Sequence, residues 1–531
     1  MTDTAAADGS EGGPARRPNI LFVITDQHRH DHVGFAGNDV VQTPNLDALA
    51  ARGMVFDNAW VANPICMPNR STIMTGRMPS VHGVIFNDRS LEWGASTHVR
   101  QFRDAGWRTG LIGKSHLQHG MSRNSVFQAK TAAAVDHGYP DGWDEIEHFE
   151  RYLDDTPPMP DDFYGFGHVE LAIDHGARVT GHHLQWALDK GGRYEDLVVP
   201  MTDESPAKRR SDRWWQVYEP PYAEELHSTN FVTERTIAFI EDAAAADEPW
   251  YAWASFPDPH HPYTPPGRWF DRHDPSEIDL PSTIGDPLEH APGYLRHIQS
   301  TPPTEQHNWV GMCGATDHDV VREATAANYG MIEFIDEGVG RILATIEALG
   351  QTDDTIVVFT ADHGDMMGDH GLMLKGFIPF NGTQRVPMVI ADPRRPAGRS
   401  SSLACSIDLG STLMELCDVS VFDGIQGRSL APVLDDAEAT VRSHVLIEDD
   451  IRELTAKRVG LPSKCRTVVS DDGLKYSRWS SGESMLFDLA ADPDEMSELR
   501  SAGDPRVAEA NERLADALIA ANDDSRGAPV R

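Results

Sequence analysis

The stretch NILFVITDQ, residues 19–27, indicates the fold of this chain. Residues 19–25 form a short, continuous apolar run, which is typical of a strand buried on both faces of a parallel sheet. The run ends at Asp26 and Gln27. These polar side chains are therefore expected at the carboxyl end of the strand, where open α/β sheets bind their ligands.

Further along the chain, apolar runs alternate with helical patterns. Strands are predicted at 109–112, 250–256, 355–360 and 387–391, and helices at 45–50, 66–74, 97–105, 229–245 and 320–349. This alternation predicts an α/β fold with a doubly wound, mostly parallel sheet. After about residue 395 the pattern changes to a helix at 407–417, short strands at 466–470, 474–478 and 485–488, and a terminal helix near 503–521. That change predicts a smaller C-terminal α+β subdomain.

The predicted organisation has three parts: a disordered leader (1–18), a central domain that carries the site (19–395) and the C-terminal subdomain (396–531). Within the central domain, residues 119–228 are polar, aromatic and His-rich, with weak periodicity. We expect this segment to be an insertion over the sheet edge that shapes the substrate pocket. Candidates to line the pocket are Tyr164, Phe166, His182, His183, Trp186 and His227, although ordinary packing explains these residues equally well.

Composition excludes several classes of protein. The 531 residues suffice for a large core, and the formal net charge of −37 argues against nucleic acid as the main partner. The five cysteines (66, 313, 405, 417 and 465) include no CxxC pair, so neither a disulfide framework nor a thiolate zinc site is expected. The first 18 residues lack an apolar signal-peptide core, and no apolar run reaches the length of a membrane span. We therefore expect a cytoplasmic location.

Two polar pairs follow predicted strands. Asp26 and Gln27 end the first strand, and Asp362 and His363 end a late one. In a parallel sheet both pairs can meet at one edge. Two carboxylates, an amide oxygen and an imidazole suit a hard-to-borderline divalent cation. A single Asp at a strand end is more often a cap or a turn residue, but two such pairs together favour a metal site.

Cys66 lies in NPICMPNR, residues 63–70, and TGR follows at 75–77. Pro68 is expected in the first turn of a helix, which places Cys66 at the helix N-terminus, where the helix dipole favours an anion. The alternative is a small buried core residue, which we expect for the other four cysteines. Further cationic candidates are Lys114 and His116 beyond a strand, His260 in the loop PDPHHP, and Lys375 in HGLMLKG.

The Cys-x-Pro-x-Arg pattern with its trailing TGR resembles the signature of type I sulfatases, formylglycine-dependent members of the alkaline phosphatase superfamily. The resemblance covers roughly residues 18–395, with further matches at 408–409 and 426–430. It implies an alkaline-phosphatase-like fold and a bound divalent cation, usually calcium. It also implies that a formylglycine-generating enzyme, as a transient partner, oxidises Cys66 to formylglycine.

The resemblance also implies roles for individual residues. The hydrated formylglycine at Cys66 attacks the sulfate ester and completes the metal shell formed by Asp26, Gln27, Asp362 and His363. Arg70 orients the hydrate, Lys114 holds a sulfate oxygen, and His116 takes the second proton of the diol. His260 and Lys375 are the candidates for protonating the leaving oxygen.

The chain departs from the family pattern in two places, of which the first bears on the conversion of Cys66 and the second on the substrate. Asn69 stands where Ser is usual. The pairs Asp-Gln and Asp-His resemble the branch that holds choline sulfatases and phosphonate monoester hydrolases, some of which prefer manganese. The leading hypothesis is a sulfatase for a small organic or sugar sulfate ester. Alternatives are a phosphonate monoester or phosphodiester hydrolase and a non-catalytic binding protein with an unmodified thiol. A homo-oligomer is left open.

Overall fold

The computed structural model describes residues 17–87, 89–120, 138–305, 312–451, 453, 456–457, 460–500 and 503–521. All but the last two residues of the predicted leader, and residues 121–137 of the predicted insertion, therefore lie outside the described residues.

A nine-stranded sheet forms the centre of the molecule, in the order β14-β2-β13-β11-β1-β9-β4-β5-β6. Strand β1 (Asn19–Thr25) lies between β11 (Thr355–Ala361) and β9 (Trp250–Phe256) and is parallel to both. The other strands are β2 (Met54–Phe56), β4 (Arg108–Gly113), β5 (His168–Ile173), β6 (Thr180–Gly181), β13 (Met388–Ala391) and β14 (Gly398–Ser400). Antiparallel pairs involve only β13 and β6. The predicted mostly parallel α/β sheet is therefore confirmed.

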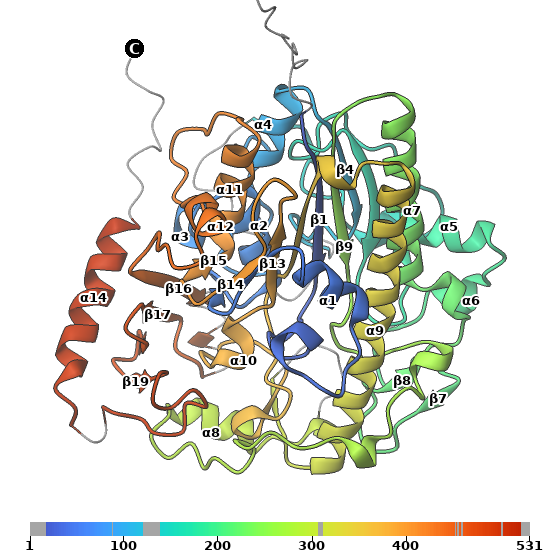
Figure 1. Ribbon diagram of the computed structural model, residues 1–531. Coiled ribbons are helices and arrows are strands. Elements are labelled where there is room, and N and C mark those ends of the chain that lie inside the picture. Colours follow the sequence, from blue (N-terminus) through green and yellow to red (C-terminus); the bar gives the residue numbers. More distant parts are fainter. Residues whose placement is uncertain are drawn as a thin grey trace, which may run out of the picture.

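Helices cover both faces of the sheet, as Figure 1 shows for a view nearly along its plane. In β1, Ile20, Phe22 and Ile24 face one core and Leu21 and Val23 face the other, so every residue of the strand is buried. One face carries α1 (Pro44–Ala50), α7 (Ser228–Ala245) and α9 (His318–Ala348). The other carries α2 (Cys66–Thr75), α4 (His98–Asp104) and α11 (Leu409–Leu416). This burial on both sides explains the continuous apolar run that the sequence shows.

The segment 138–228 extends the sheet as well as covering its edge. It supplies β5, which pairs in parallel with β4, and the antiparallel edge strand β6. It also contains α5 (His182–Asp189), α6 (Tyr194–Leu197) and the pair β7 (Arg209–Arg210) and β8 (Tyr218–Glu219). The sequence-based prediction missed both central-sheet strands, because β5 spans only six residues and β6 only two, within polar surroundings.

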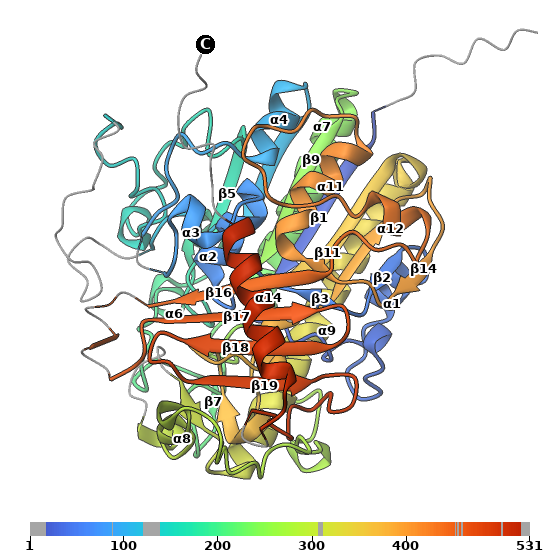
Figure 2. The ribbon, with the colours of Figure 1, turned by 90° about the vertical axis from the view of Figure 1, so that its left-hand side faces the viewer.

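The C-terminal subdomain is an antiparallel sheet with one covering helix (Figure 2). Its strands are β16 (His444–Asp450), β17 (Lys464–Ser470), β18 (Leu474–Trp479) and β19 (Ser484–Asp488), and α14 (Arg506–Ala520) packs across them. Strand β16 was not predicted, and its three last residues are acidic. The predicted division at residue 395 also differs from the structure, because β14 joins the central sheet and α11 packs in the central core.

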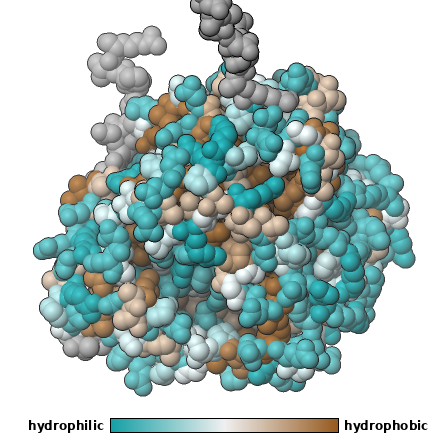
Figure 3. Space-filling view, in the orientation of Figure 1, coloured by the Kyte–Doolittle hydropathy of each residue, from teal (hydrophilic) through white to brown (hydrophobic). Residues whose placement is uncertain are grey.

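Short elements complete the described chain: α3 (Pro79–His82), α8 (Gly293–Gln299), α10 (Asn381–Gln384), α12 (Ala431–Asp435), β3 (Ala59–Trp60), β10 (Cys313–Gly314), β12 (Leu372–Met373) and β15 (Ala404–Cys405). The face seen in Figure 3 is mostly hydrophilic, with smaller apolar areas between the polar ones. Among the described residues, no helix combines the length and apolar character that crossing a membrane requires.

Candidate active site

The carboxyl ends of β1 and β11 bring the two predicted pairs together. Thr25 and Ala361 are register partners at the last position of these parallel strands. Asp26 and Asp362 follow directly, and the backbone N–H of Gln27 donates to Asp362 Oδ1 at 3.1 Å. Asp26, Asp362 and His363 are fully buried. Adjacent parallel strands thus place carboxylates from sequence positions more than 300 residues apart at one edge.

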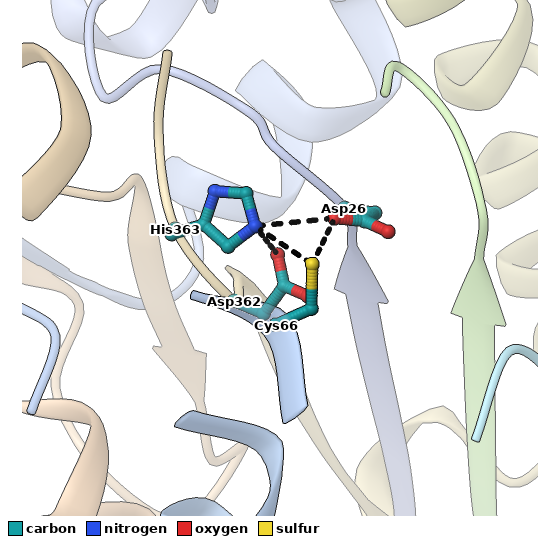
Figure 4. A group of neighbouring side chains, drawn as sticks. All are labelled: Asp26, Cys66, Asp362 and His363. Carbon is teal, nitrogen blue, oxygen red and sulfur yellow. Dashed lines mark hydrogen bonds and ion pairs between the residues drawn. The ribbon is translucent and has the colours of Figure 1, made fainter. Parts of the chain in front are cut away.

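Four side chains converge there, as Figure 4 shows. One ligand atom each from Asp26, Cys66, Asp362 and His363 lies within 4.8 Å of the others. His363 Nε2 is 3.1 Å from Cys66 Sγ, 3.4 Å from Asp26 Oδ1 and 3.6 Å from Asp362 Oδ1. Two buried carboxylates and an imidazole around one point are a donor set that fits a divalent cation.

The side chain of Gln27 has other partners. Its amide Nε2 donates to Asp365 Oδ2 and lies 3.0 Å from His261 Nδ1. The same Asp365 oxygen accepts from Tyr263 Oη at 2.8 Å. Gln27 itself adopts a left-handed backbone conformation, with φ of 59°. The Gln27 amide is therefore hydrogen-bonded to residues beside the four-residue group. Its role as a metal ligand stays a prediction.

Cys66 is the first residue of α2, and all ten residues of this helix are buried. Pro68 lies in the first turn, as the sequence predicted, and the N–H of Met67 donates to Asn87 Oδ1 at 3.0 Å. One turn along, Arg70 donates through Nε to Asp362 Oδ2 at 2.7 Å. Its Nη1 donates to Lys114 O at 3.0 Å and to Ser255 Oγ at 2.8 Å. Arg70 thus fixes one carboxylate of the group to the ends of β4 and β9.

Asn69, the departure from the family pattern, connects three segments. Its Nδ2 donates to Asp362 O at 2.6 Å. Its Oδ1 accepts from Ser406 Oγ at 2.7 Å and from Ala62 N at 3.2 Å. A serine hydroxyl is too short to make all three contacts, so the asparagine is part of how this chain anchors α2 beneath the site.

Two lysines reach the group from different sides. Lys114 Nζ forms an ion pair with Asp26 Oδ2. Lys375 Nζ lies 2.8 Å from both Cys66 Sγ and His363 Nε2, and 3.9 Å from Asp26 Oδ1. Gly113 permits the approach of Lys114, because a Cβ at residue 113 would lie 1.9 Å from Ser255 O and the backbone φ is 104°.

These charges determine the electrostatics of the site. Burial would raise the pKa of Asp26, but Lys114, His260 and Lys375 hold it well below its usual value. Burial and Asp26 act to raise the pKa of Cys66, yet Lys114, Lys375 and His363 bring it below that of an ordinary thiol. Burial and Lys375 act to lower the pKa of His363, and Asp362, Cys66 and Asp26 raise it to about 9. The position of Cys66 Sγ therefore favours an anion despite the acidic chain.

His260 and His116 both lie close to His175. The His260 ring stacks on His175 at a centroid distance of 3.8 Å and on His261 at 4.1 Å. His116 has φ of 55°, and its ring centroid is 6.2 Å from that of His175. His116 Nδ1 has no hydrogen-bond partner among the described residues. Burial, Lys114 and His175 lower the pKa of His116 well below its usual value, which favours the neutral imidazole.

Two residues of the segment 138–228 join this site and were not singled out from the sequence. His175, between β5 and β6, has Nε2 at 2.7 Å from Lys114 Nζ and 3.2 Å from Asp26 Oδ2. Glu147 accepts the backbone N–H groups of His116, Leu117 and Gln118 at 2.7, 3.0 and 2.9 Å. The His-rich composition of the segment was the only sequence feature that pointed to His175. The spacing of residues pointed to neither His175 nor Glu147.

The aromatic and His candidates of the same segment pack elsewhere. Tyr164 and Phe166 are fully buried in the central core. His183 Nε2 donates to Leu226 O at 2.8 Å, and its ring stacks on Phe231. Trp186 also packs against Phe231. His182 Nδ1 accepts from Leu171 N, and His227 lies 3.6 Å from Asp258. These contacts agree with ordinary packing, the alternative to pocket lining for these residues.

A metal-compatible group around a cysteine, flanked by lysines and histidines at the carboxyl edge of an α/β sheet, fits the class of metal-assisted ester hydrolases. Comparison with known proteins identifies the family. Residues 18–419 match the family model described as Sulfatase, and residues 368–524 match that described as N-sulphoglucosamine sulphohydrolase, C-terminal. The chain belongs to the Sulfatase family and is a sulfuric ester hydrolase. The resemblance found in the sequence is confirmed.

Relatives cover most of the chain. An arylsulfatase of Clostridium perfringens is 29% identical over 494 residues, which are 91% of this chain and 90% of the relative. A choline-sulfatase of Rhizobium meliloti is 26% identical over 491 residues, or 91% of this chain and 82% of the relative. The structure of a phosphonate monoester hydrolase of Agrobacterium radiobacter has a TM-score of 0.76 at 22% identity, covering 96% of this chain and 97% of that one. This structural likeness supports the alkaline-phosphatase-like fold.

Proposed function

We propose that this enzyme hydrolyses the sulfate ester of a small organic or sugar alcohol, with a formylglycine derived from Cys66 as nucleophile. The observation that carries the proposal is the convergence of Asp26, Cys66, Asp362 and His363, with Lys375 Nζ at 2.8 Å from Cys66 Sγ. The thiol marks where the oxygen of a hydrated formylglycine would lie. Sulfate is an anion, and the two lysines near this position supply positive charge where it would bind.

A divalent cation held by Asp26, Asp362 and His363 would supply Lewis acidity to the nucleophile and the sulfuryl oxygens. The buried carboxylates and the imidazole fit such an ion. Arg70 orients Asp362 through the bond to Oδ2, and Lys114 and Lys375 neutralise charge on the sulfuryl group. Calcium is the expectation from the family, with manganese as the alternative. Calcium takes oxygen ligands, so the imidazole of His363 argues for the manganese alternative.

The proton for the leaving alcohol comes from His260 or Lys375. Lys375 Nζ is 3.9 Å from Asp26 Oδ1, and a ring nitrogen of His260 lies within 4.8 Å of an Asp26 oxygen, so both residues lie close to the reacting group. His116 is proposed as the base that takes the second proton of the diol, because its neutral form is favoured and its Nδ1 is unpartnered among the described residues.

Phosphonate monoester or phosphodiester hydrolysis is the second candidate. One support is the Asp-Gln and Asp-His pairs. Another is a relative that is 25% identical over 514 residues, the multifunctional alkaline phosphatase superfamily protein PehA of Trinickia caryophylli. The same machinery would accept either tetrahedral group, because the protein contacts are directed at oxygen atoms.

The decisive experiment combines mass spectrometry with paired assays. The enzyme is expressed with and without a formylglycine-generating enzyme, and the mass of the peptide containing Cys66 is measured. Activity on nitrophenyl sulfate that rises with the formylglycine fraction and vanishes in Cys66→Ala supports the proposal. Equal activity of the unmodified thiol form contradicts the nucleophile assignment. Faster turnover of a phenylphosphonate monoester than of the sulfate favours the second candidate.

We also propose a cytoplasmic location for this enzyme. Fractionation of the source cells tests this location, and the same preparation gives the oligomeric state by light scattering.

A further inference from the structure

His175 comes from a loop that is braced at both ends. Strand β5 pairs in parallel with β4, so the loop after β5 runs beside the loop that carries Lys114. Asp174 and Gly176 both have left-handed backbones, with φ of 74° and 60°. Arg178 Nη1 pairs with Asp174 Oδ2 at 3.1 Å, and Thr180 Oγ1 donates to Ile173 O at 2.8 Å. The loop therefore presents a single, buried imidazole to the site.

The contact between His175 and Lys114 has a defined direction. An ammonium group has only donors, so Lys114 Nζ donates to His175 Nε2 across 2.7 Å. Nε2 also lies 3.2 Å from Asp26 Oδ2, but its contact with Lys114 is the shorter one, so we assign Nε2 as the acceptor nitrogen and place the ring proton on Nδ1. A second N–H of Lys114 is taken by Asp26 Oδ2. One N–H of the ammonium remains for an anion bound beside Cys66.

We infer that His175 is a positioning residue, which orients the ammonium of Lys114 so that its remaining N–H is directed at the substrate. The inference deepens the proposed function and rests on it, because that function gives Lys114 an oxygen of the bound ester to hold. Without the acceptor at His175, Lys114 keeps its pair with Asp26 but is free to rotate about it. The ester then loses a donor fixed in advance of binding.

A second contact links His175 to the proposed acid. The His175 and His260 rings stack with centroids 3.8 Å apart and planes inclined by 26°. Substitution by Phe preserves a flat ring for this stack while removing the acceptor nitrogen. Substitution by Gln does the reverse, since a Gln oxygen can reach the position of Nε2. The pair of variants separates the effect on Lys114 from that on His260.

A competing assignment is a second cation site. Ligand atoms of Asp26, His175 and His260 lie within 4.8 Å of one another, a spacing that suits one ion. In the structure, however, Lys114 Nζ contacts both Asp26 Oδ2 and His175 Nε2. The ammonium therefore already supplies the positive charge that an ion would bring, and we assign the place to Lys114.

A double-mutant cycle tests the inference. His175→Phe and His175→Gln are made in the wild-type enzyme and in Lys114→Ala, and kcat and KM are measured with nitrophenyl sulfate on formylglycine-containing protein. We expect His175→Phe to lower kcat/KM by about 10- to 100-fold in the wild type. In Lys114→Ala the same substitution should change it by less than about twofold. His175→Gln should retain most of the wild-type value.

Several outcomes would overturn the inference. One is an equal loss of kcat/KM from His175→Phe in the wild type and in Lys114→Ala. Another is a loss of kcat/KM in His175→Gln as large as that in His175→Phe. A second equivalent of metal that His175→Phe removes would make His175 a ligand instead. His168→Phe is the matched control, since His168 lies on the same strand β5 and its side chain is 37% exposed and paired with Glu170. Its kcat/KM should stay within about twofold of the wild-type value.

Controls keep folding and function separate. Thermal unfolding of each variant is recorded, and His175→Leu replaces His175→Phe if the latter does not fold. If the wild type turns over a phosphonate ester but no sulfate ester, the proposed substrate is wrong, and the cycle is measured on the phosphonate instead. If the effects of the His175 and Lys114 substitutions on kcat/KM were independent in that assay too, the positioning role would also be contradicted.

Discussion

The strand ends and the segment 138–228 contribute to one site in different ways. From the ends of β1 and β11 come Asp26, Asp362 and His363, each next to a buried strand with a strong sequence pattern. From the segment come His175 and Glu147, on loops whose sequence carries no motif. Chemistry that lies at strand ends can be recognised from sequence, whereas the residues that orient it come from chain without regular periodicity.

The largest effect should come from the strand ends. Asp362→Ala removes a buried carboxylate from the candidate metal group and leaves Arg70, which is fully buried, without its ion-pair partner. We expect loss of bound metal together with a fall in kcat/KM of about three orders of magnitude or more, because metal catalysis supplies several kcal/mol. Elemental analysis and steady-state kinetics measure the two losses.

Asp353→Ala is the control for that variant. Asp353 is exposed and lies just before β11, at the opposite end of the strand from Asp362. Metal content and kcat/KM should remain those of the wild type. Stoichiometric metal in Asp362→Ala would rule out the four-residue group as the binding site.

His260 and Lys375 should give the next largest effects, distinguished by the leaving group. Loss of a donor to developing charge costs about 2.7–4 kcal/mol in comparable sites. If His260 is the acid, His260→Ala should slow alkyl esters far more than activated aryl esters, because an aryl oxide needs little protonation. Rates across a series of leaving-group pKa values give the slope. An equal loss for all esters would assign His260 to binding and pass the acid role to Lys375 or water.

The same difference between strand ends and the segment 138–228 explains how much of the fold and the site could be predicted from the sequence. The β1 and β11 pairs and the Cys66 helix were predicted because a buried strand, or a helix with proline in its first turn, leaves a local pattern. Pairing between segments far apart in sequence determines β5, β6 and the contacts of Glu147 and His175. A short or polar stretch of sequence carries no pattern that predicts such pairing. Gln27 shows the limit within a predicted site. Its position was foreseen, but its partners Asp365 and His261 were set by tertiary packing.

Glu147 offers a smaller effect from the motif-free segment. Its carboxylate accepts three consecutive N–H groups of the loop that carries His116. Glu147→Gln turns one oxygen into a donor facing those N–H groups, which leaves buried donors unpaired at about 1–3 kcal/mol each. We expect a lower melting temperature and a fall in kcat of about tenfold to a hundredfold, through misplacement of His116.

Glu150→Gln is the matched control, because Glu150 is exposed and lies three residues after Glu147, in the 3-10 helix Phe149–Tyr152. It should leave both quantities unchanged. A Glu147→Gln enzyme that melts earlier but keeps full kcat would show that the segment stabilises the loop without positioning His116.

The smallest effect on activity should come from Trp186, which tests the boundary between pocket and packing within the same segment. The Trp186 ring packs edge-on against Phe231 at a centroid distance of 5.5 Å, and Lys190 Nζ lies 4.1 Å above it. It therefore joins α5 to α7 on the outer layer, on the opposite side of the sheet from Cys66 in α2. Trp186→Leu should reduce the free energy of unfolding by about 1–3 kcal/mol, measured by denaturant titration, because a half-buried ring is truncated. Since no step of the proposed reaction depends on that layer, kcat/KM for aryl and alkyl sulfates should stay within about twofold. A change in the ratio of those two values would mean that Trp186 contacts the alcohol of the substrate, and the aromatic residues of the segment would then have to be regarded as pocket walls.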